Sequence, residues 1–216
     1  MRDIDELLHE IGSLRTGGAR YAAFFAVMAY AGMRPSEVAG LQIDDLDLPA
    51  SGWGVARLRA ARPSPGTRYT ETSSTRQVKA LKHRADGEVR SVPLPPVLVD
   101  LLNKHLKQWP PVAGLVFTNA AGNSVTPENY SKVWLRLRSS VWPEGHVAAD
   151  AVPYDLRHSA ASMMIRAGVP LGEISRRLGH SVDVLLRTYA GVFESDLIEA
   201  NSKIDEELGR LGPPDR

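Results

Sequence analysis

Hydrophobic residues recur at helical spacing from the beginning of this 216-residue chain. Ile4, Leu7, Leu8 and Ile11 fall every three or four residues, with polar and charged residues between them. In a helix these four side chains share one face, because about 3.6 residues complete a turn. The pattern therefore predicts a short amphipathic helix at the start of the sequence.

A second apolar run, residues 20–32, is hydrophobic almost all round and predicts a buried helix. Pro35 follows shortly afterwards. Proline suits the first turn of a helix, because its missing N–H would have no partner there in any case. Arg34 is therefore expected at a junction between two helices, a place where a side chain is held in a fixed direction.

The middle of the chain changes to a β-type pattern and then returns to helix. Residues 53–60 and 75–94 contain alternating or β-favouring runs around a stretch rich in Pro, Gly, Ser and Thr, which predicts a small antiparallel sheet with one long loop. Further helices are predicted at Pro96–Trp109, Pro127–Val141, Tyr154–Ala167, Leu171–Leu178 and Val182–Tyr189. Gly168 and Gly179 are expected helix stops. The pattern indicates an α+β chain that is mainly helical.

Composition adds few constraints. At 43% hydrophobic residues the chain can bury a substantial core, and it fits one large domain or one domain with a tail. The absence of cysteine excludes a disulfide scaffold and a cysteine-based metal site. No stretch reaches about 18 uninterrupted apolar residues, and the N-terminus has no apolar signal core. We therefore expect no membrane partner and a cytoplasmic location.

The net charge of only +1 hides an uneven distribution of charge. The basic residues of the segment 57–90 are Arg57, Arg59, Arg62, Arg68, Arg76, Lys79, Lys82, Arg84 and Arg90. Only Glu71, Asp86 and Glu88 oppose them, and Lys132, Arg136 and Arg138 form a second basic run. Clustered cations bind phosphates by releasing counterions, so local density matters more than the total. The sequence predicts one basic face that binds nucleic acid, with acidic flanks.

Candidate chemistry lies mainly in the last third of the chain. The motif DLRH contains Arg157, LGH ends at His180, and Tyr189 follows in LLRTYAG. If Arg34 of the early GMRPSE joins them, two guanidinium groups converge on one site and match the non-bridging oxygens of a phosphodiester. A tyrosine, with an ordinary pKa of about 10, becomes a nucleophile only among cations and proton acceptors. These four residues are therefore the candidates for a phosphodiester-cleaving site.

Three segments carry a resemblance to a known family. GMRPSEVAGLQIDDLDL, VRSVPLPPVLVDLL and YDLRHSAASMMIRAGVPLGEISRRLGHSVDVLLRTYAG, in this order, resemble the catalytic domain of the tyrosine recombinases, the phage integrase family. The resemblance covers most of residues 18–193. It implies an integrase-like, DNA breaking–rejoining fold with a small three-stranded antiparallel sheet. It also implies a site-specific DNA recombinase that cleaves and rejoins strands through a covalent 3′-phosphotyrosyl intermediate, with no metal or cofactor, to integrate or excise a mobile element.

Matched position by position, the resemblance gives roles to individual residues. Arg34 looks like the first catalytic arginine, Arg157 the second, His180 the family histidine and Tyr189 the nucleophile. Tyr154 occupies a position where the family usually has a histidine, which leaves the proton acceptor of the reaction open. A phenol there can still bind a phosphate oxygen or relay a proton.

The family's catalytic lysine lies on a β-hairpin before a V-P-L-P signature. Lys79 and Lys82 both precede Val92–Pro95, and their spacing of three positions places their side chains on opposite faces of a strand. Lys82 is the preferred candidate because it is nearer the expected turn at residues 85–87. Further candidates for DNA contacts are Lys79, Arg76, Arg84 and His158, the last of these more as structural support.

The resemblance also suggests how the chain is organised. Residues 1–193 are expected to form the catalytic domain and residues 194–216 a helical tail, with the family's core-binding and arm-binding domains absent, so that the chain is a fragment or a truncated protein. The tail has an apolar face that docks on a neighbouring protomer or packs on its own domain: Leu197, Ile198, Ile204, Leu208 and Leu211. The expected partners are double-stranded DNA and other protomers in a tetrameric synapse.

Two other functions fit the same residues. A type IB topoisomerase-like enzyme shares the arginines and the tyrosine but relaxes DNA without recombining it. A non-catalytic DNA-binding or regulatory derivative binds DNA and forms no covalent adduct. Each candidate residue also has a purely structural reading, such as a surface charge for Arg34 or a helix-face tyrosine for Tyr189.

Overall fold

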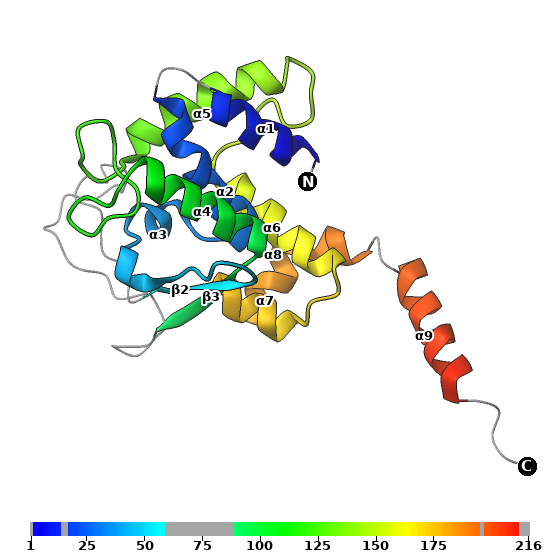
Figure 1. Cartoon of the computed structure of the whole chain (residues 1–216). Helices are drawn as coiled ribbons and strands as arrows, with labels where there is room; N and C mark the ends of the chain where they lie inside the picture. The colour runs from blue at the N-terminus through cyan, green and yellow to red at the C-terminus, as the bar shows by residue number, and fades with distance from the viewer. Residues whose placement is uncertain (1, 14–16, 59–88, 195–196, 212–216) are drawn as a thin grey trace, which may run out of the picture. The chain divides into compact units, whose positions relative to one another are not determined.

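The computed structural model describes residues 2–13, 17–58, 89–194 and 197–211 (Figure 1). The described elements are α1 (Arg2–Ser13), η1 (Gly18–Tyr21), α2 (Ala22–Ala31), α3 (Pro35–Ala39), η2 (Ile43–Asp45), β1 (Leu46–Asp47), β2 (Gly54–Leu58), β3 (Arg90–Leu94), α4 (Pro96–Gln108), α5 (Pro127–Val141), α6 (Asp155–Arg166), α7 (Leu171–Leu178), α8 (Val182–Glu194) and α9 (Leu197–Leu211). The chain divides into two compact units, residues 1–160 and residues 161–216. All of the described strands belong to the first unit.

Helix α2 forms the centre of the first unit. It contacts α1, α4 and β3, which explains why it is apolar all round, as the sequence predicts. The ring of Phe24 lies 5.5 Å from that of Phe117 and 5.3 Å from that of Tyr130, and the ring of Phe25 lies 5.4 Å from that of Trp134. These aromatic contacts give the core a fixed geometry.

The described sheet has the antiparallel order β1-β2-β3, with Ala56 paired to Leu46 on one side and to Val92 on the other. Pro93 has no N–H to donate, and β3 is accordingly an edge of the described sheet. At Gly54 a Cβ atom would come within 2.6 Å of the Asp47 carbonyl oxygen, so only glycine fits between the strands here. The three-stranded antiparallel sheet of the prediction is confirmed, although the two-residue strand β1 was not identified from the pattern.

The predicted helices agree closely with the described ones. Helices α5 and α7 have the predicted bounds, α4 ends one residue earlier than predicted, and α6 is one residue shorter at each end. Gly168 and Gly179 end helices in the left-handed conformation, with φ of 70° and 64°. The predicted end of the last catalytic helix at Tyr189 coincides with the kink of α8, and a further helical segment, which was not predicted, continues to Glu194.

The C-terminal tail contains a helix, α9, as predicted. Two residues of its expected apolar face, Ile204 and Leu208, are 56% and 60% exposed. The division into a catalytic domain and a tail at residue 193 stays a prediction. Among the helices of the described ranges, none has the combination of length and apolar character that crossing a membrane requires.

His105 is a buried titratable group in this core. It is 4% exposed, its Nε2 lies 3.1 Å from the Val116 carbonyl oxygen, and its ring is 4.9 Å from that of Phe117. Nε2 must carry the proton in this contact, because a carbonyl oxygen only accepts. Burial lowers the pKa of His105. The charge of Arg20 lowers this pKa as well, and the hydrogen bond to Val116 raises it by less than the other two effects lower it. The folded chain therefore holds this imidazole neutral.

We predict that His105 makes the fold less stable in acid. The unfolded histidine takes up a proton below about pH 6.5, whereas the folded one resists it until a lower pH, so the free energy of unfolding falls over that window by up to about 1.4 kcal/mol per pH unit. Urea unfolding of the wild type and of His105→Leu at pH 7.5 and 5.5 checks this, with the variant expected to lose less stability on acidification. The exposed His9 provides the control, His9→Gln. Equal losses in wild type and His105→Leu would contradict the prediction.

Candidate active site

Arg34 lies where the sequence predicts it, between two helices. Helix α2 ends at Gly32, whose φ of 67° turns the chain, and Pro35 occupies the first turn of α3. Arg34 itself has extended backbone angles, φ −72° and ψ 149°, as the residue before a proline should. The side chain is 29% exposed. Local sequence therefore fixes both the position and the direction of this guanidinium group.

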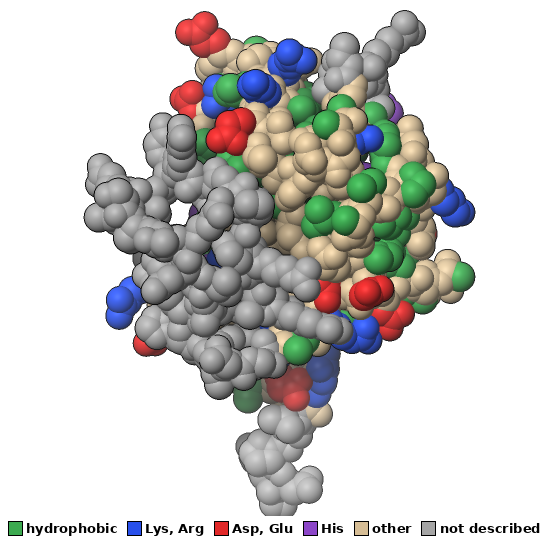
Figure 2. Space-filling model, turned by 90° about the vertical axis from the view of Figure 1, so that its left-hand side faces the viewer, with side chains coloured by type: hydrophobic (Ala, Val, Ile, Leu, Met, Phe, Trp, Pro, Cys, Tyr) green, Lys and Arg blue, Asp and Glu red, His purple; other side chains and the backbone are tan. Residues whose placement is uncertain are grey.

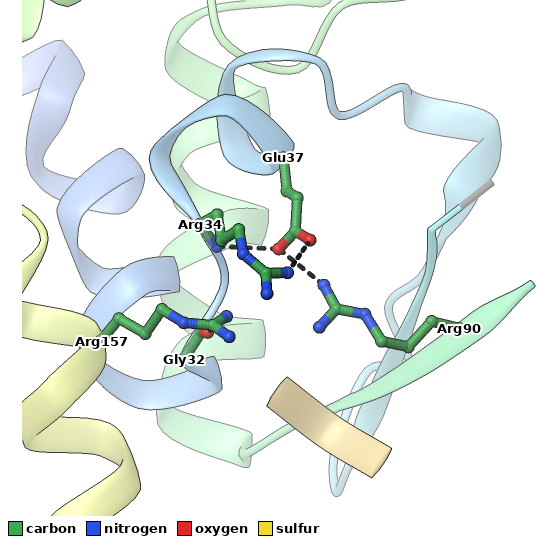
Figure 3. A network of polar contacts seen from close by, with 5 residues as sticks. All are labelled: Gly32, Arg34, Glu37, Arg90 and Arg157. Atoms are coloured by element: carbon green, nitrogen blue, oxygen red, sulfur yellow. Dashed lines mark hydrogen bonds and ion pairs between the residues drawn. The ribbon is translucent and has the colours of Figure 1, made fainter. Parts of the chain in front are cut away.

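Glu37 ties Arg34 to the strand β3 (Figure 3). The Glu37 carboxylate accepts hydrogen bonds from the Arg34 backbone N–H at 2.8 Å and from Arg34 Nη1 at 3.0 Å. Its Oε2 also forms an ion pair with Nη2 of Arg90 at 2.6 Å. The side chains of Glu37 and Arg90 are only 5% and 2% exposed. One buried carboxylate thus holds two arginines from separate parts of the chain.

Arg157 completes the group from the start of α6. Its side chain is fully buried, and its Nη1 donates a hydrogen bond to the carbonyl oxygen of Gly32, two residues before Arg34. In Figure 3 the guanidinium groups of Arg34, Arg90 and Arg157 all point into the space beside Glu37. The structure therefore brings the two predicted catalytic arginines together.

Among the described residues the charges in this cluster do not balance. There, three guanidinium groups and one carboxylate give a formal charge of about +2. Burial by itself raises the pKa of Glu37. The charge of Arg90, the hydrogen bond from the Arg34 N–H and the charges of Arg34 and Arg157 have the opposite and larger effect. The pKa of Glu37 therefore lies below its ordinary value. Burial and the charge of Arg34 lower the pKa of Arg157 to about 10. At neutral pH the cluster therefore keeps its excess positive charge and suits an anion.

Tyr154 and His158 flank Arg157 on the same stretch of chain. Their rings lie 5.2 Å apart and meet edge to face at 66°. Tyr154 is 36% exposed, and His158 is half-buried. Tyr154 is also close enough to Arg157 to affect its pKa. A phenol and an imidazole are therefore available beside the second arginine.

His180 and Tyr189 lie in the second unit, in which α7 and α8 pack together. Gly179 turns the chain into His180, whose carbonyl oxygen accepts a hydrogen bond from the Ser175 hydroxyl. Tyr189 is 4% exposed and stands at the kink of α8, with φ −117° and ψ 20°. The convergence of these two residues with the arginines stays a prediction.

Four predicted residues, Lys79, Lys82, Arg76 and Arg84, lie outside the described residues. Arg90 does not belong to a basic face as predicted, because it is buried in the ion pair with Glu37. On the face shown in Figure 2, the described side chains of both charges lie scattered near the margins, without one broad basic area. The predicted basic face therefore stays a prediction for the remaining residues of that segment.

Sequence reasoning missed Glu37 and Arg90 as members of the site. The signal for Glu37 was its spacing of three residues from Arg34 across Pro35, which allows a carboxylate to reach back to the N–H of the residue before a helix. Arg90 gave no comparable local signal. In the described part of the chain, no group of three or more His, Cys, Asp or Glu residues is arranged to hold a metal ion.

Comparison with known proteins gives the family. The sequence model of the phage integrase family matches residues 1–195. The chain belongs to the phage integrase family. Among relatives of this integrase-family chain, the tyrosine recombinase XerD of Lacticaseibacillus casei is 25% identical over 93% of the chain and 60% of its own length.

Solved structures of the family share the fold. The Tn1549 transposon integrase, in complex with transposon right end DNA, matches 86% of this chain and 58% of its own with a TM-score of 0.65 and 18% identity. The catalytic domain of bacteriophage HP1 integrase matches 91% of this chain and 90% of its own with a TM-score of 0.53 and 21% identity. The predicted integrase-like fold is confirmed. This integrase-family chain spans about half to three-fifths of the length of the first curated relatives it matches.

Proposed function

We propose that this chain is the catalytic part of a site-specific DNA recombinase that integrates or excises a mobile element. The observation that carries the proposal is the buried cluster in which Arg34 and Arg157 lie close together with an excess of positive charge. Paired guanidinium groups match the non-bridging oxygens of a phosphodiester in geometry and charge. The DNA complex of the Tn1549 integrase supports double-stranded DNA as the substrate.

The proposed reaction is an exchange of phosphate esters. The Tyr189 oxygen attacks the scissile phosphorus, and the new O–P bond forms as the bond to the 5′-oxygen breaks. Arg34 and Arg157 bind the non-bridging oxygens, His180 donates a further hydrogen bond and Lys82 gives a proton to the leaving 5′-oxygen. A 5′-hydroxyl of the partner strand then reverses the attack. Because the phosphotyrosyl bond keeps the energy of the phosphodiester, resealing requires no nucleotide hydrolysis.

The proton of the Tyr189 hydroxyl must also find an acceptor. We give this place to Tyr154, which stands where the family has a histidine, and its ring contact with His158 supports the assignment. A phenol can accept a proton from one neighbour and pass its own to another. In this proposal the Tyr189 proton passes to Tyr154, and His158 beside it is the final acceptor.

Two groups of the proposed machinery are closed to solvent. Arg157 is fully buried and Tyr189 is 4% exposed. We infer that the surrounding chain opens before a DNA phosphate reaches them. We infer that DNA binding and chemistry are coupled through such a rearrangement, with the kink at Tyr189 as one place where α8 can change its course.

We also propose that the active form contains several protomers on DNA, as in a tetrameric synapse. The exposed residues Ile204 and Leu208 of α9 support a protein contact at this helix. Burying such side chains against a second copy of the chain would stabilise the assembly by removing apolar surface from water.

The test of the proposed function uses the full chain and a library of nicked duplexes with randomised arm sequences. A nick beside the scissile phosphate lets the short 5′-fragment diffuse away, so that a cleaving enzyme stays attached to the DNA. We expect SDS-resistant protein–DNA adducts that survive denaturing gels, and sequencing of their DNA identifies the target. DNA binding without adducts would favour the non-catalytic derivative. Relaxation of supercoiled plasmid without recombination of two selected sites would favour the topoisomerase-like enzyme.

A further inference from the structure

Arg90 is the buried member of the arginine cluster that the proposed reaction does not use. Its side chain is 2% exposed, and its Nη2 lies 2.6 Å from Oε2 of Glu37. It begins β3, and its backbone pairs with Leu58 at the end of β2. Removing an arginine side chain from water costs free energy, so a buried arginine at the first residue of a strand needs a compensating interaction.

The contacts of Glu37 explain why Arg90 is buried here. Glu37 accepts two hydrogen bonds from Arg34, one from the backbone N–H and one from Nη1. These contacts fix the direction of the Arg34 side chain. Without Arg90, however, the same carboxylate would offset more of the charge of Arg34, because the two groups form an ion pair at 3.0 Å. A neutral pair attracts a phosphate much less than a free guanidinium group does.

Arg90 removes this conflict. It pairs with Oε2, the oxygen that also accepts the Arg34 N–H, whereas Arg34 Nη1 contacts Oε1. Glu37 and Arg90 together are formally neutral, so that, among the described residues of the cluster, Glu37 leaves the charge of Arg34 in excess. Arg34 is also the most exposed of the three, with 29% of its side chain exposed against 2% for Arg90. Arg34 is thus the partly exposed arginine, and Arg90 is the buried arginine that pairs with the Glu37 carboxylate.

We propose that Arg90 is a positioning residue of the strand-transfer site: it is the counter-ion of Glu37, and it thereby lets Glu37 orient Arg34 without cancelling its charge. The proposal rests on the proposed function, since it concerns the same phosphate-binding arginine. Arg90 acts through Glu37 and does not touch the DNA. A purely structural arginine, by contrast, would support β3 irrespective of the charge on residue 37.

The experiment is a double-mutant cycle on the rate of covalent capture of nicked duplex. Arg90→Met removes the charge and keeps most of the side-chain length, and it is expected to slow capture about 10- to 100-fold. Arg90→Lys keeps the charge and is expected to stay within about fivefold of the wild type. The decisive variant is Glu37→Gln with Arg90→Met. Once the carboxylate is gone, loss of Arg90 should change the rate by no more than about twofold.

Controls make the outcomes distinct. Arg210→Met removes an exposed arginine that pairs with Glu207 at 3.0 Å, and capture is expected to stay unchanged. If Arg90→Met is too unstable to assay, Glu37→Gln alone and the double variant are compared, and equal rates support the proposal. An equal loss from Arg90→Met with Glu37 or Gln at position 37 overturns it. Absence of any adduct from the wild type instead overturns the proposed function, and the role of Arg90 with it.

Discussion

Replacing Tyr189 by Phe is expected to abolish covalent capture of DNA, by about 10³-fold or more, because the variant has no oxygen with which to attack phosphorus. DNA binding is expected to stay within about two- to threefold of the wild type, since only one hydroxyl is removed. The measurement compares adducts on denaturing gels with gel shifts from the same reaction, on duplexes selected with the wild-type chain.

The location of Tyr189 makes this substitution a clean one. The side chain is 4% exposed, and the residue adopts the non-helical angles that kink α8. Phenylalanine keeps the ring, so the packing of the ring and the kink are retained. A loss of capture then reports on the hydroxyl and does not reflect a change of fold, which the circular dichroism spectrum of the variant verifies.

A half-buried tyrosine serves as the control. Tyr130 stacks on Phe24 with ring centroids 5.3 Å apart, and burial, reinforced by the charge of Glu128, raises its pKa. Tyr130→Phe removes a hydroxyl from the first unit of the chain and is expected to leave capture unchanged. Adducts formed by Tyr189→Phe at the wild-type rate would remove Tyr189 as the nucleophile and move the search to other hydroxyl groups.

Local signals in the sequence were sufficient for most of the helices. Helix α5 begins after Thr126, whose backbone N–H donates to the Asn129 side chain at 3.1 Å, and a proline occupies its first turn. Helix α7 ends at Gly179, where φ is 64°. Both ends depend on neighbouring residues only, and so a reader of the sequence can place them.

Features that depend on distant residues were not predictable in the same way. Arg90 looks like any other cation in a basic segment, and its burial follows only from Glu37, which lies far away in the sequence. Strand β1 has two residues, too few for an alternating pattern. The extension of α8 beyond Tyr189 was missed because one kinked residue resembles a helix end, although the helix then resumes.

The candidate site also contains residues that the sequence identified and contacts that only the tertiary structure shows. The family motifs identified Arg34 and Arg157, and the structure confirms that they lie near each other through the contact between Arg157 and Gly32. Nothing in the motifs indicates what compensates two neighbouring like charges, one of which is fully buried. That information is in the tertiary structure, where Glu37 receives hydrogen bonds and ion pairs from two sides.

Replacing Arg157 by Lys is expected to reduce covalent capture by about 10²- to 10³-fold, the usual cost of losing one donor to a developing charge. The planar fork of arginine can bind Gly32 and a phosphate oxygen at once, whereas an ammonium group is a single point charge. The variant is also expected to be less stable by about 1–3 kcal/mol, because the buried Gly32 carbonyl oxygen loses its partner. Thermal unfolding measures this second effect.

The pH dependence of covalent capture by Arg157→Lys distinguishes two causes of a lower rate: loss of the positive charge at residue 157 and loss of the planar guanidinium group. The surroundings of Arg157 lower its pKa to about 10, chiefly through burial and the charge of Arg34. A lysine has an ordinary pKa of only about 10.4, so the same surroundings would bring it towards neutral pH and leave part of it uncharged. The ratio of capture by the variant to capture by the wild type is therefore expected to rise as the pH falls from 9 to 7.

The matched control lies on the same helix. Arg166 is exposed near the end of α6, and Arg166→Lys is expected to change neither capture nor stability, with a ratio to the wild type that is flat across the same pH range. A flat ratio for Arg157→Lys, combined with a large loss of capture, would assign the loss to the missing fork alone. Full activity of Arg157→Lys would contradict the phosphate-binding role, because a site that accepts either cation does not need two donors in one plane.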